Sequence, residues 1–329
     1  MAGWRGQDRP VAELMAGLAG ERFHHAWLLG GPAGIGKAGI AHDFAKRLLG
    51  AQADPLVAPD HLAIRAGDPV ARLVDAGTHP DLVLIRRLPR DAKKGEAPTL
   101  ARNINVDQVR SLSRFLHLAP SMAERRVVLI DAAEDMERGA ANALLKNLEE
   151  PPRNTIFLLI SHMPGRLLPT IRSRCRALHF QPLDDGAMED VLTAVVPDLS
   201  APDRTALIRG AEGAPGRALA MRDLDLTGME AALERIAQSG DPTHKERIQL
   251  ARSLAPKAAQ ARYEAFLEYV PHYIARRLRT VRTSADAQKA DAWSEAVALG
   301  QGAITLSLDP SATIFALCGS VARLAERNG

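Results

Sequence analysis

A short glycine-rich segment constrains this chain more than any other feature. Residues 31–38 contain two glycines separated by four residues, with a lysine directly after the second. The segment follows an apolar run at 26–29 and precedes a helical pattern at 37–49. In a strand–loop–helix of this kind, backbone amides and the helix N-terminus wrap phosphate oxygens while the lysine adds positive charge. The pattern predicts a phosphate loop formed by Gly31, Gly34, Gly36, Lys37 and Ala38.

Five apolar runs predict the fold around this loop. None of them alternates with polar residues, which is typical of strands buried on both faces of a parallel sheet. Helical patterns with apolar residues three and four apart lie between them. The sequence therefore predicts an α/β domain whose five parallel strands cover residues 26–29, 82–85, 127–130, 156–160 and 177–180, with helices at 37–49, 106–118 and 138–149.

Two positions carry alanine where nucleotide hydrolysis needs a reactive group. The residue after Lys37 usually bears the hydroxyl that binds Mg²⁺, and here it is Ala38. Asp131, at the end of the third run, is the candidate for a metal-orienting carboxylate, but Ala132 stands where a glutamate usually activates water. We expect Glu134 to be a solvated carboxylate near a helix start. The pattern predicts that ATP or ADP binds without turnover.

The strand signal stops after residue 181. Residues 182–224 have the pattern of a small helical domain, and 225–329 also have helical periodicity throughout. The sequence thus predicts three domains, at 1–181, 182–224 and 225–329. Pro271 predicts a kink or break in a helix at 258–281. The basic run at 276–282 could suit DNA, but we expect a solvated or subunit-facing stripe.

Composition excludes several classes of protein and names no partner. Lys and Arg exceed Asp and Glu by 42 to 39, a net charge of +3 that permits nucleic-acid contact without requiring it. Cys175 and Cys318 lie far apart, so we expect neither a disulfide framework nor a paired-cysteine metal site. The N-terminal residues lack a signal-peptide pattern, and no apolar stretch reaches the roughly 20 residues that span a bilayer. We expect a cytoplasmic protein.

Several longer motifs stand in a defined order along the chain: His24-His25-Ala26, the AGTHPD segment at 76–81, the NALLKNLEEPP segment at 142–152, and Ser173-Arg174-Cys175. Together they resemble the motifs of bacterial clamp-loader subunits of DNA polymerase III, especially the delta-prime kind. The resemblance covers residues 22–220. It implies an AAA+ core, a helical lid and a C-terminal collar domain. It also implies a five-subunit ring with gamma or tau and delta subunits, which loads the sliding clamp onto primed DNA.

The resemblance assigns a role to one arginine. In the family, the Ser-Arg-Cys motif lies at a subunit face where its arginine reaches ATP held by a neighbouring gamma or tau subunit. Arg174, flanked by Ser173 and Cys175, is the corresponding trans-acting finger. Many relatives also carry a four-cysteine zinc knuckle, but residues 50–81 contain no cysteine, so no structural zinc is expected. Hydrolysing relatives also carry a lid arginine, and the resemblance places Gly216 at that position, or Arg217 if the register differs by one residue.

Three functions remain open at this stage. A non-hydrolysing clamp-loader subunit is favoured by Ala38 and Ala132. An ATP-hydrolysing subunit of the gamma or tau kind is favoured by Lys37 and Asp131, although such a chain would continue past the collar. A nucleic-acid-dependent AAA+ motor, such as a branch-migration helicase, would normally retain both catalytic positions. ATP turnover by the isolated chain separates the first function from the other two.

Overall fold

The computed structural model describes residues 4–20, 23–56, 61–89, 100–222, 225–280 and 286–325. Their contacts divide the chain into two compact units. The first comprises Met1–Ala194 with Gly213–Gly216, and the second comprises Val195–Glu212 with Arg217–Gly329. The three-domain division expected from the sequence stays a prediction.

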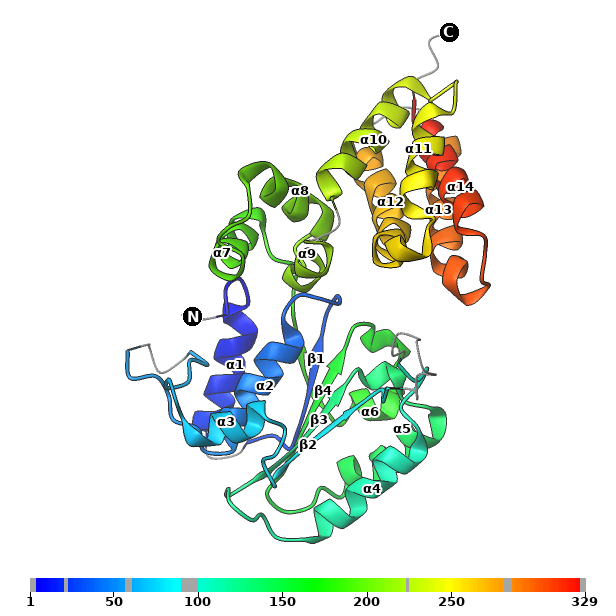
Figure 1. Ribbon diagram of the computed structural model, residues 1–329. Coiled ribbons are helices and arrows are strands. Elements are labelled where there is room, and N and C mark those ends of the chain that lie inside the picture. The colour runs from blue at the N-terminus through cyan, green and yellow to red at the C-terminus, as the bar shows by residue number, and fades with distance from the viewer. Residues whose placement is uncertain are drawn as a thin grey trace. The chain divides into compact units, whose positions relative to one another are not determined.

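A parallel sheet forms the centre of the first unit (Figure 1). In the described residues it has five strands in the order β2-β3-β4-β1-β5, and every neighbouring pair is parallel. This confirms the α/β fold and the five strands predicted from the apolar runs. The strands are β1 (Ala26–Gly30), β2 (Leu82–Arg86), β3 (Arg126–Asp131), β4 (Thr155–Ser161) and β5 (Arg176–His179).

Helices cover both faces of this sheet (Figure 1). Successive strand residues point to opposite faces, so Trp27 and Leu29 pack in one hydrophobic core while Ala26 and Leu28 pack in the other. The first core includes side chains of α1 (Asp8–Ala19), α2 (Lys37–Leu48) and α3 (Pro69–Asp75). The second includes side chains of α4 (Val106–His117), α5 (Arg138–Glu149) and α6 (Pro169–Arg172), and α7 (Asp185–Val195) follows the sheet.

A buried aspartate fastens the loop before β3. Asp81 is 1% exposed, and its carboxylate accepts hydrogen bonds from the backbone N–H groups of Ser121, Met122 and Ala123 at 2.7, 2.7 and 2.9 Å. Burial raises the pKa of this carboxyl, but the three amides and His79 outweigh that effect and hold the pKa below its usual value. The AGTHPD segment thus has a structural role beside β2.

We expect Asp81→Asn to lower the free energy of unfolding at pH 7 by about 2–3 kcal/mol, because a charged acceptor of three amides is lost. The folded-state pKa of Asp81 is depressed, so its contribution is present above the unfolded pKa of about 3.9 and is lost as pH falls through the folded pKa. Urea unfolding from pH 7 to pH 3 should show the difference between the two proteins shrinking below pH 4.

Asp54→Asn is the matched control, because Asp54 accepts only an exposed hydrogen bond from the Leu56 amide among those seen. It should change the free energy of unfolding by less than about 0.5 kcal/mol. Equal stability of Asp81→Asn and the parent at pH 7 would contradict the role given to Asp81.

All regular secondary structure in the described residues of the second unit is helical. It contains α8 (Ala201–Ala211), α10 (Leu226–Ser239), α11 (Lys245–Leu254), α12 (Gln260–Thr280), α13 (Asp286–Thr305) and α14 (Pro310–Ala322), while α9 (Pro215–Met221) begins at the end of the first unit. Helices α10 to α14 pack side by side (Figure 1). Among all described residues, no helix combines the length and apolar character needed to cross a bilayer.

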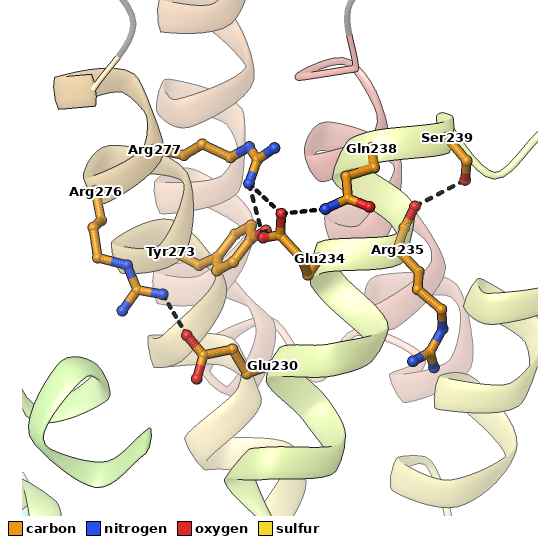
Figure 2. A network of polar contacts seen from close by, with 8 residues as sticks. All are labelled: Glu230, Glu234, Arg235, Gln238, Ser239, Tyr273, Arg276 and Arg277. Atoms are coloured by element: carbon orange, nitrogen blue, oxygen red, sulfur yellow. Dashed lines mark hydrogen bonds and ion pairs between the residues drawn. The ribbon is translucent and has the colours of Figure 1, made fainter. Parts of the chain in front are cut away.

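Ion pairs join α10 to α12 (Figure 2). Arg277 donates to both carboxylate oxygens of Glu234 at 2.7 and 2.8 Å, and the Tyr273 hydroxyl donates to the same carboxylate at 2.6 Å. Arg276 donates to Glu230 at 2.8 Å and to the Arg209 carbonyl of α8 at 3.2 Å. Arg276 and Arg277 therefore form ion pairs within the second unit, with about a third of each side chain exposed, so the solvated alternative is wrong for these two residues. The subunit-facing alternative stays a prediction. Residues 281 and 282 of that run lie outside the described residues.

Helix α12 continues through Pro271, so the expected break is not found. Proline has no N–H to donate to the carbonyl four residues earlier, which is that of Leu267. Gly300 of α13 lies against this carbonyl: a Cβ atom built there would stand 2.6 Å from the Leu267 oxygen. The close approach of the two helices requires glycine at this position.

Replacing Gly300 with alanine should destabilise the protein by about 1–3 kcal/mol, because the new methyl group overlaps backbone that cannot move aside easily. This loss opposes the gain of about 1 kcal/mol that alanine normally brings to a helix. Gly302→Ala in the same helix is the control, since its Cβ would make ordinary contact with the Leu306 side chain at 3.5 Å. Urea unfolding that ranks both variants alike would contradict this account.

Candidate functional site

The predicted phosphate loop connects β1 to α2. Gly31 has φ 151°, and a Cβ atom there would lie 2.4 Å from the Phe180 carbonyl oxygen, so only glycine fits. Gly36 has φ 97° and precedes the first residue of α2. The carbonyl of Gly34 accepts a hydrogen bond from the amide of Gly216 at 2.8 Å. Glycines of this loop therefore adopt backbone conformations that other residues rarely adopt, and Gly216 packs against the loop.

Lys37 is buried and is held by the loop itself. The residue is 3% exposed, and its Nζ donates hydrogen bonds to the carbonyl oxygens of Gly31 and Pro32. Burial lowers the pKa of Lys37 to about 8, and the nearby carboxylates of Glu134 and Asp131 oppose this shift. A bound phosphate would have to draw the ammonium group away from these carbonyls.

The residues of this loop fit a phosphate group better than they fit a phosphate with Mg²⁺. Glycine-rich backbone, a helix N-terminus and Lys37 are present, as phosphate binding requires. Ala38 is exposed at the next position and offers no metal ligand. Across the described ranges, no group of three or more His, Cys, Asp or Glu side chains is arranged to hold a metal ion.

Strands β3 and β4 end beside the loop and bring polar groups to the same edge. Asp131 closes β3, and burial raises its pKa while His162 and Lys37 act in the opposite direction. The expectation of a solvated Glu134 is wrong: its carboxylate accepts from the backbone amides of His162 and Met163 at 2.7 and 3.2 Å. Because these amides follow β4, the contact could not be read from spacing along the sequence.

Polar groups at the end of β4 were not among the predicted site residues. The Ser161 hydroxyl and His162 Nδ1 are both buried there without a hydrogen-bond partner in the described residues, as is one oxygen of Glu134. Ser161 pairs with Gly30 across the sheet, which places it level with the start of the phosphate loop. Its position at the end of a buried strand is the signal that could have identified it, since carboxyl ends of parallel strands commonly form ligand sites.

Arg174 lies on a different part of the first unit. Its guanidinium is 2.7 Å from a carboxylate oxygen of Glu149 and donates to the Thr170 carbonyl at 3.0 Å. About a third of the side chain is exposed. Ser173 is exposed, whereas Cys175 packs against the core under α4–α6, where burial raises the pKa of its thiol to about 12. The burial of Cys318 in α14 has the same effect on its thiol pKa.

Sheet topology separates Arg174 from the phosphate loop. Arg174 lies two residues before the start of β5, so it stands at the edge formed by the amino ends of the strands. The loop follows β1 and stands at the edge formed by their carboxyl ends. The four residues of β5, at about 3.3 Å per residue, separate the two edges by roughly 13 Å. The structure therefore brings Lys37, Asp131 and Glu134 together and leaves Arg174 apart.

Gly216, the residue predicted at the lid-arginine position, contacts the phosphate loop through its backbone amide. Gly216 has no side chain, and a Cβ atom there would lie 3.1 Å from Gly34 Cα. In the second unit, Arg217 lies 3.9 Å from the carboxylate of Glu212. The assignment of Gly216 to the lid-arginine position stays a prediction.

The charge of Glu134 should be measurable at Lys37. We expect Glu134→Gln to lower the Lys37 pKa below its value of about 8, because the carboxylate that opposes desolvation is removed while an oxygen remains for the two amides. A pH titration of the lysine ¹³Cε resonances would measure this. Glu137→Gln, on an exposed neighbouring residue, should leave the Lys37 pKa unchanged. A Lys37 that titrates near 10.5 would contradict the burial argument.

Comparison with known proteins identifies relatives. A family model described as DNA polymerase III, delta subunit, matches residues 6–184. The chain is 45% identical to DNA polymerase III subunit delta' of Pseudomonas aeruginosa over 163 residues, which cover 49% of this chain and 45% of that protein. It is 33% identical to subunit delta' of Escherichia coli K12 over 220 residues, which cover 66% of this chain and 60% of that protein. It thus spans about half the length of these relatives.

Other matches support the fold. Subunit tau of Escherichia coli K12 is 35% identical over 182 residues, which cover 54% of this chain and 25% of tau. A gamma subunit-related protein of Thermotoga maritima has a TM-score of 0.51 and 16% identity, and the match covers 96% of this chain and 100% of that one. This structural likeness shows the fold alone. Since the family model matches more than half of the chain, the chain belongs to the DNA polymerase III delta-subunit family.

Proposed function

We propose that this chain is a non-hydrolysing clamp-loader subunit of the delta-prime kind. It acts in the cytoplasm with gamma or tau and delta subunits of DNA polymerase III, and the complex places a sliding clamp on primed DNA. In that assembly Arg174 contributes to the ATP site of a neighbouring gamma or tau subunit. The family membership and the delta' relatives support this function.

One observation carries the proposal: the site that would bind nucleotide lacks reactive groups, while the candidate arginine stands at the other edge of the same sheet. Ala38 and Ala132 occupy the positions of the metal-binding hydroxyl and the water-activating glutamate. In addition, the Lys37 ammonium donates to carbonyl oxygens of its own loop, where a phosphate would have to compete with them. Nucleotide at Gly31, Gly34, Gly36 and Lys37 would therefore bind without being turned over.

The chemistry of Arg174 suits action on a neighbour. A guanidinium is always charged and presents a planar fork that matches phosphate oxygens, so it can stabilise charge that develops during phosphoryl transfer. The parallel pairing of β1 with β5 places Arg174 and the phosphate loop at opposite edges of the sheet, so Arg174 is too far away to contact a phosphate bound in its own loop. Supplying the arginine from a separate subunit would make hydrolysis depend on assembly.

A second candidate, an ATP-hydrolysing subunit of the gamma or tau kind, is supported by two features. Asp131 lies close enough to Lys37 for their charges to affect each other's pKa, as in a working site. The similarity to tau also extends over more than half of this chain. The experiments below distinguish this candidate from the first.

In a reconstituted clamp loader, Arg174→Ala should lower ATP hydrolysis at the adjoining site by about 10³-fold or more, as removal of an arginine finger does. The total rate, measured with clamp and primed DNA, should fall by the share that this site contributes. Arg172→Ala is the control, because Arg172 is an exposed neighbour at the end of α6. Size-exclusion chromatography must show that both complexes remain assembled.

Turnover by the isolated chain tests the other half of the proposal. We expect no ATP hydrolysis above that of buffer. If the isolated chain hydrolyses ATP at a rate abolished by Lys37→Ala, the chain is an ATPase of the gamma or tau kind. If Arg174→Ala leaves the assembled complex fully active, the trans role of Arg174 is wrong.

A further inference from the structure

We infer that Glu149 is a positioning residue for Arg174: it holds the guanidinium at the surface of the first unit and gives it up when a neighbour's phosphate is present. This inference rests on the proposed function of Arg174. The two residues come from separate elements, since Glu149 ends α5 and Arg174 follows α6. Both stand at the edge formed by the amino ends of the strands, because α5 leads into β4 and Arg174 leads into β5.

The guanidinium has a carboxylate partner that a ligand could replace, and it has further partners on its own segment, the Thr170 carbonyl and, at 3.5 Å, the Ser173 hydroxyl. Glu149 Oε1 lies 2.7 Å from Nη2, and nearly half of the Glu149 side chain is exposed. The Thr170 carbonyl accepts a hydrogen bond from Nη1 at 3.0 Å, and Thr170 lies in α6, the helix that Arg174 follows. A ligand that displaced the carboxylate could leave the carbonyl contact in place. The exchange therefore needs only a rotation of a side chain.

Glu149 occupies a position that would otherwise disfavour its charge. It is the last residue of α5, where the helix dipole and unpaired carbonyls repel a carboxylate, and Glu150 adds a second negative charge beside it. The Arg174 guanidinium offsets this cluster. When Arg174 leaves, two carboxylates remain uncompensated at the negative end of a helix. Their repulsion favours re-formation of the ion pair between Glu149 and Arg174.

The pair is suited to competition with phosphate. Ion pairs with both partners partly exposed are weak, so the contact restrains Arg174 without trapping it. An outer phosphate carries more negative charge than a carboxylate and matches the guanidinium fork equally well. Glu149 would thus fix the orientation of the Arg174 guanidinium until nucleotide is present. It would also set the ATP concentration at which the guanidinium leaves the carboxylate and binds the neighbour's phosphate.

The test uses the reconstituted clamp loader with clamp and primed DNA. Glu149→Gln keeps the size and helical preference of the side chain but removes its charge. We expect the ATP concentration for half-maximal hydrolysis to fall by about two- to fivefold, the range that a weak ion pair can supply. The maximal rate should stay within a factor of two. Glu150→Gln removes the exposed charge next in sequence, which the structure does not place in the ion pair with Arg174, so it should lower the half-saturating concentration by a smaller factor than Glu149→Gln does.

The same substitution in an Arg174→Ala background should have no effect on half-saturation, because there is no guanidinium left to release. A rise in the half-saturating concentration with Glu149→Gln would overturn the inference, since it would mean that Glu149 assists the transfer. A shift of equal size in the Arg174→Ala background, or with Glu150→Gln, would overturn it as well.

A measurement on the isolated chain separates failure of this inference from failure of the proposed function. A double-mutant cycle of Glu149→Gln and Arg174→Ala, followed by urea unfolding, should show non-additive effects that diminish in 1 M NaCl. Additive effects with an unchanged half-saturation would reject the pairing while Arg174 kept its trans role. Non-additive effects with a fully active Arg174→Ala complex would reject the trans role, and with it the transfer to phosphate.

Discussion

The parallel pairing of β1 with both β4 and β5 is the constraint on which both candidate sites depend. It aligns Gly30 with Ser161 on one side and with His179 on the other. Every strand therefore ends at the edge that carries the phosphate loop and begins at the edge that carries Arg174. A register shift of one residue would move Trp27 from one hydrophobic core into the other, where the smaller side chains of Ala26 and Leu28 now pack, so the two cores fix the register that separates the two sites.

Buried charge at the loop is balanced locally. Lys37 would be costly to bury alone, and its ammonium is offset by two loop carbonyls and by the field of Asp131 and Glu134. Glu134 in turn is fixed by backbone amides that follow β4. The loop thus persists as a stable structural element without the groups that hydrolysis requires. Selection for a stable loop and selection for catalysis can be separated in such an arrangement.

Periodicity predicted what depends on local sequence. The five strands and the helices α2, α4 and α5 all follow from residues that are neighbours in the chain. Periodicity did not predict α1 or α3, and it could not give the contact of Glu134 with the end of β4 or that of Arg174 with Glu149. These contacts join segments 25 or more residues apart, so only the packed structure determines them. Helix α12 runs through Pro271 without a break, and the Leu267 carbonyl that has no N–H partner there lies against Gly300 of the facing helix, a contact that local sequence does not reveal.

Both native cysteines are chemically quiet at neutral pH. A thiol must ionise to react with maleimides or iodoacetamides, and burial holds Cys175 and Cys318 protonated far above pH 7. A cysteine introduced on an exposed helix would therefore react much faster than either of them. The unmodified chain is thus a suitable background for attaching a single fluorophore or spin label, without first replacing the cysteine that adjoins Arg174.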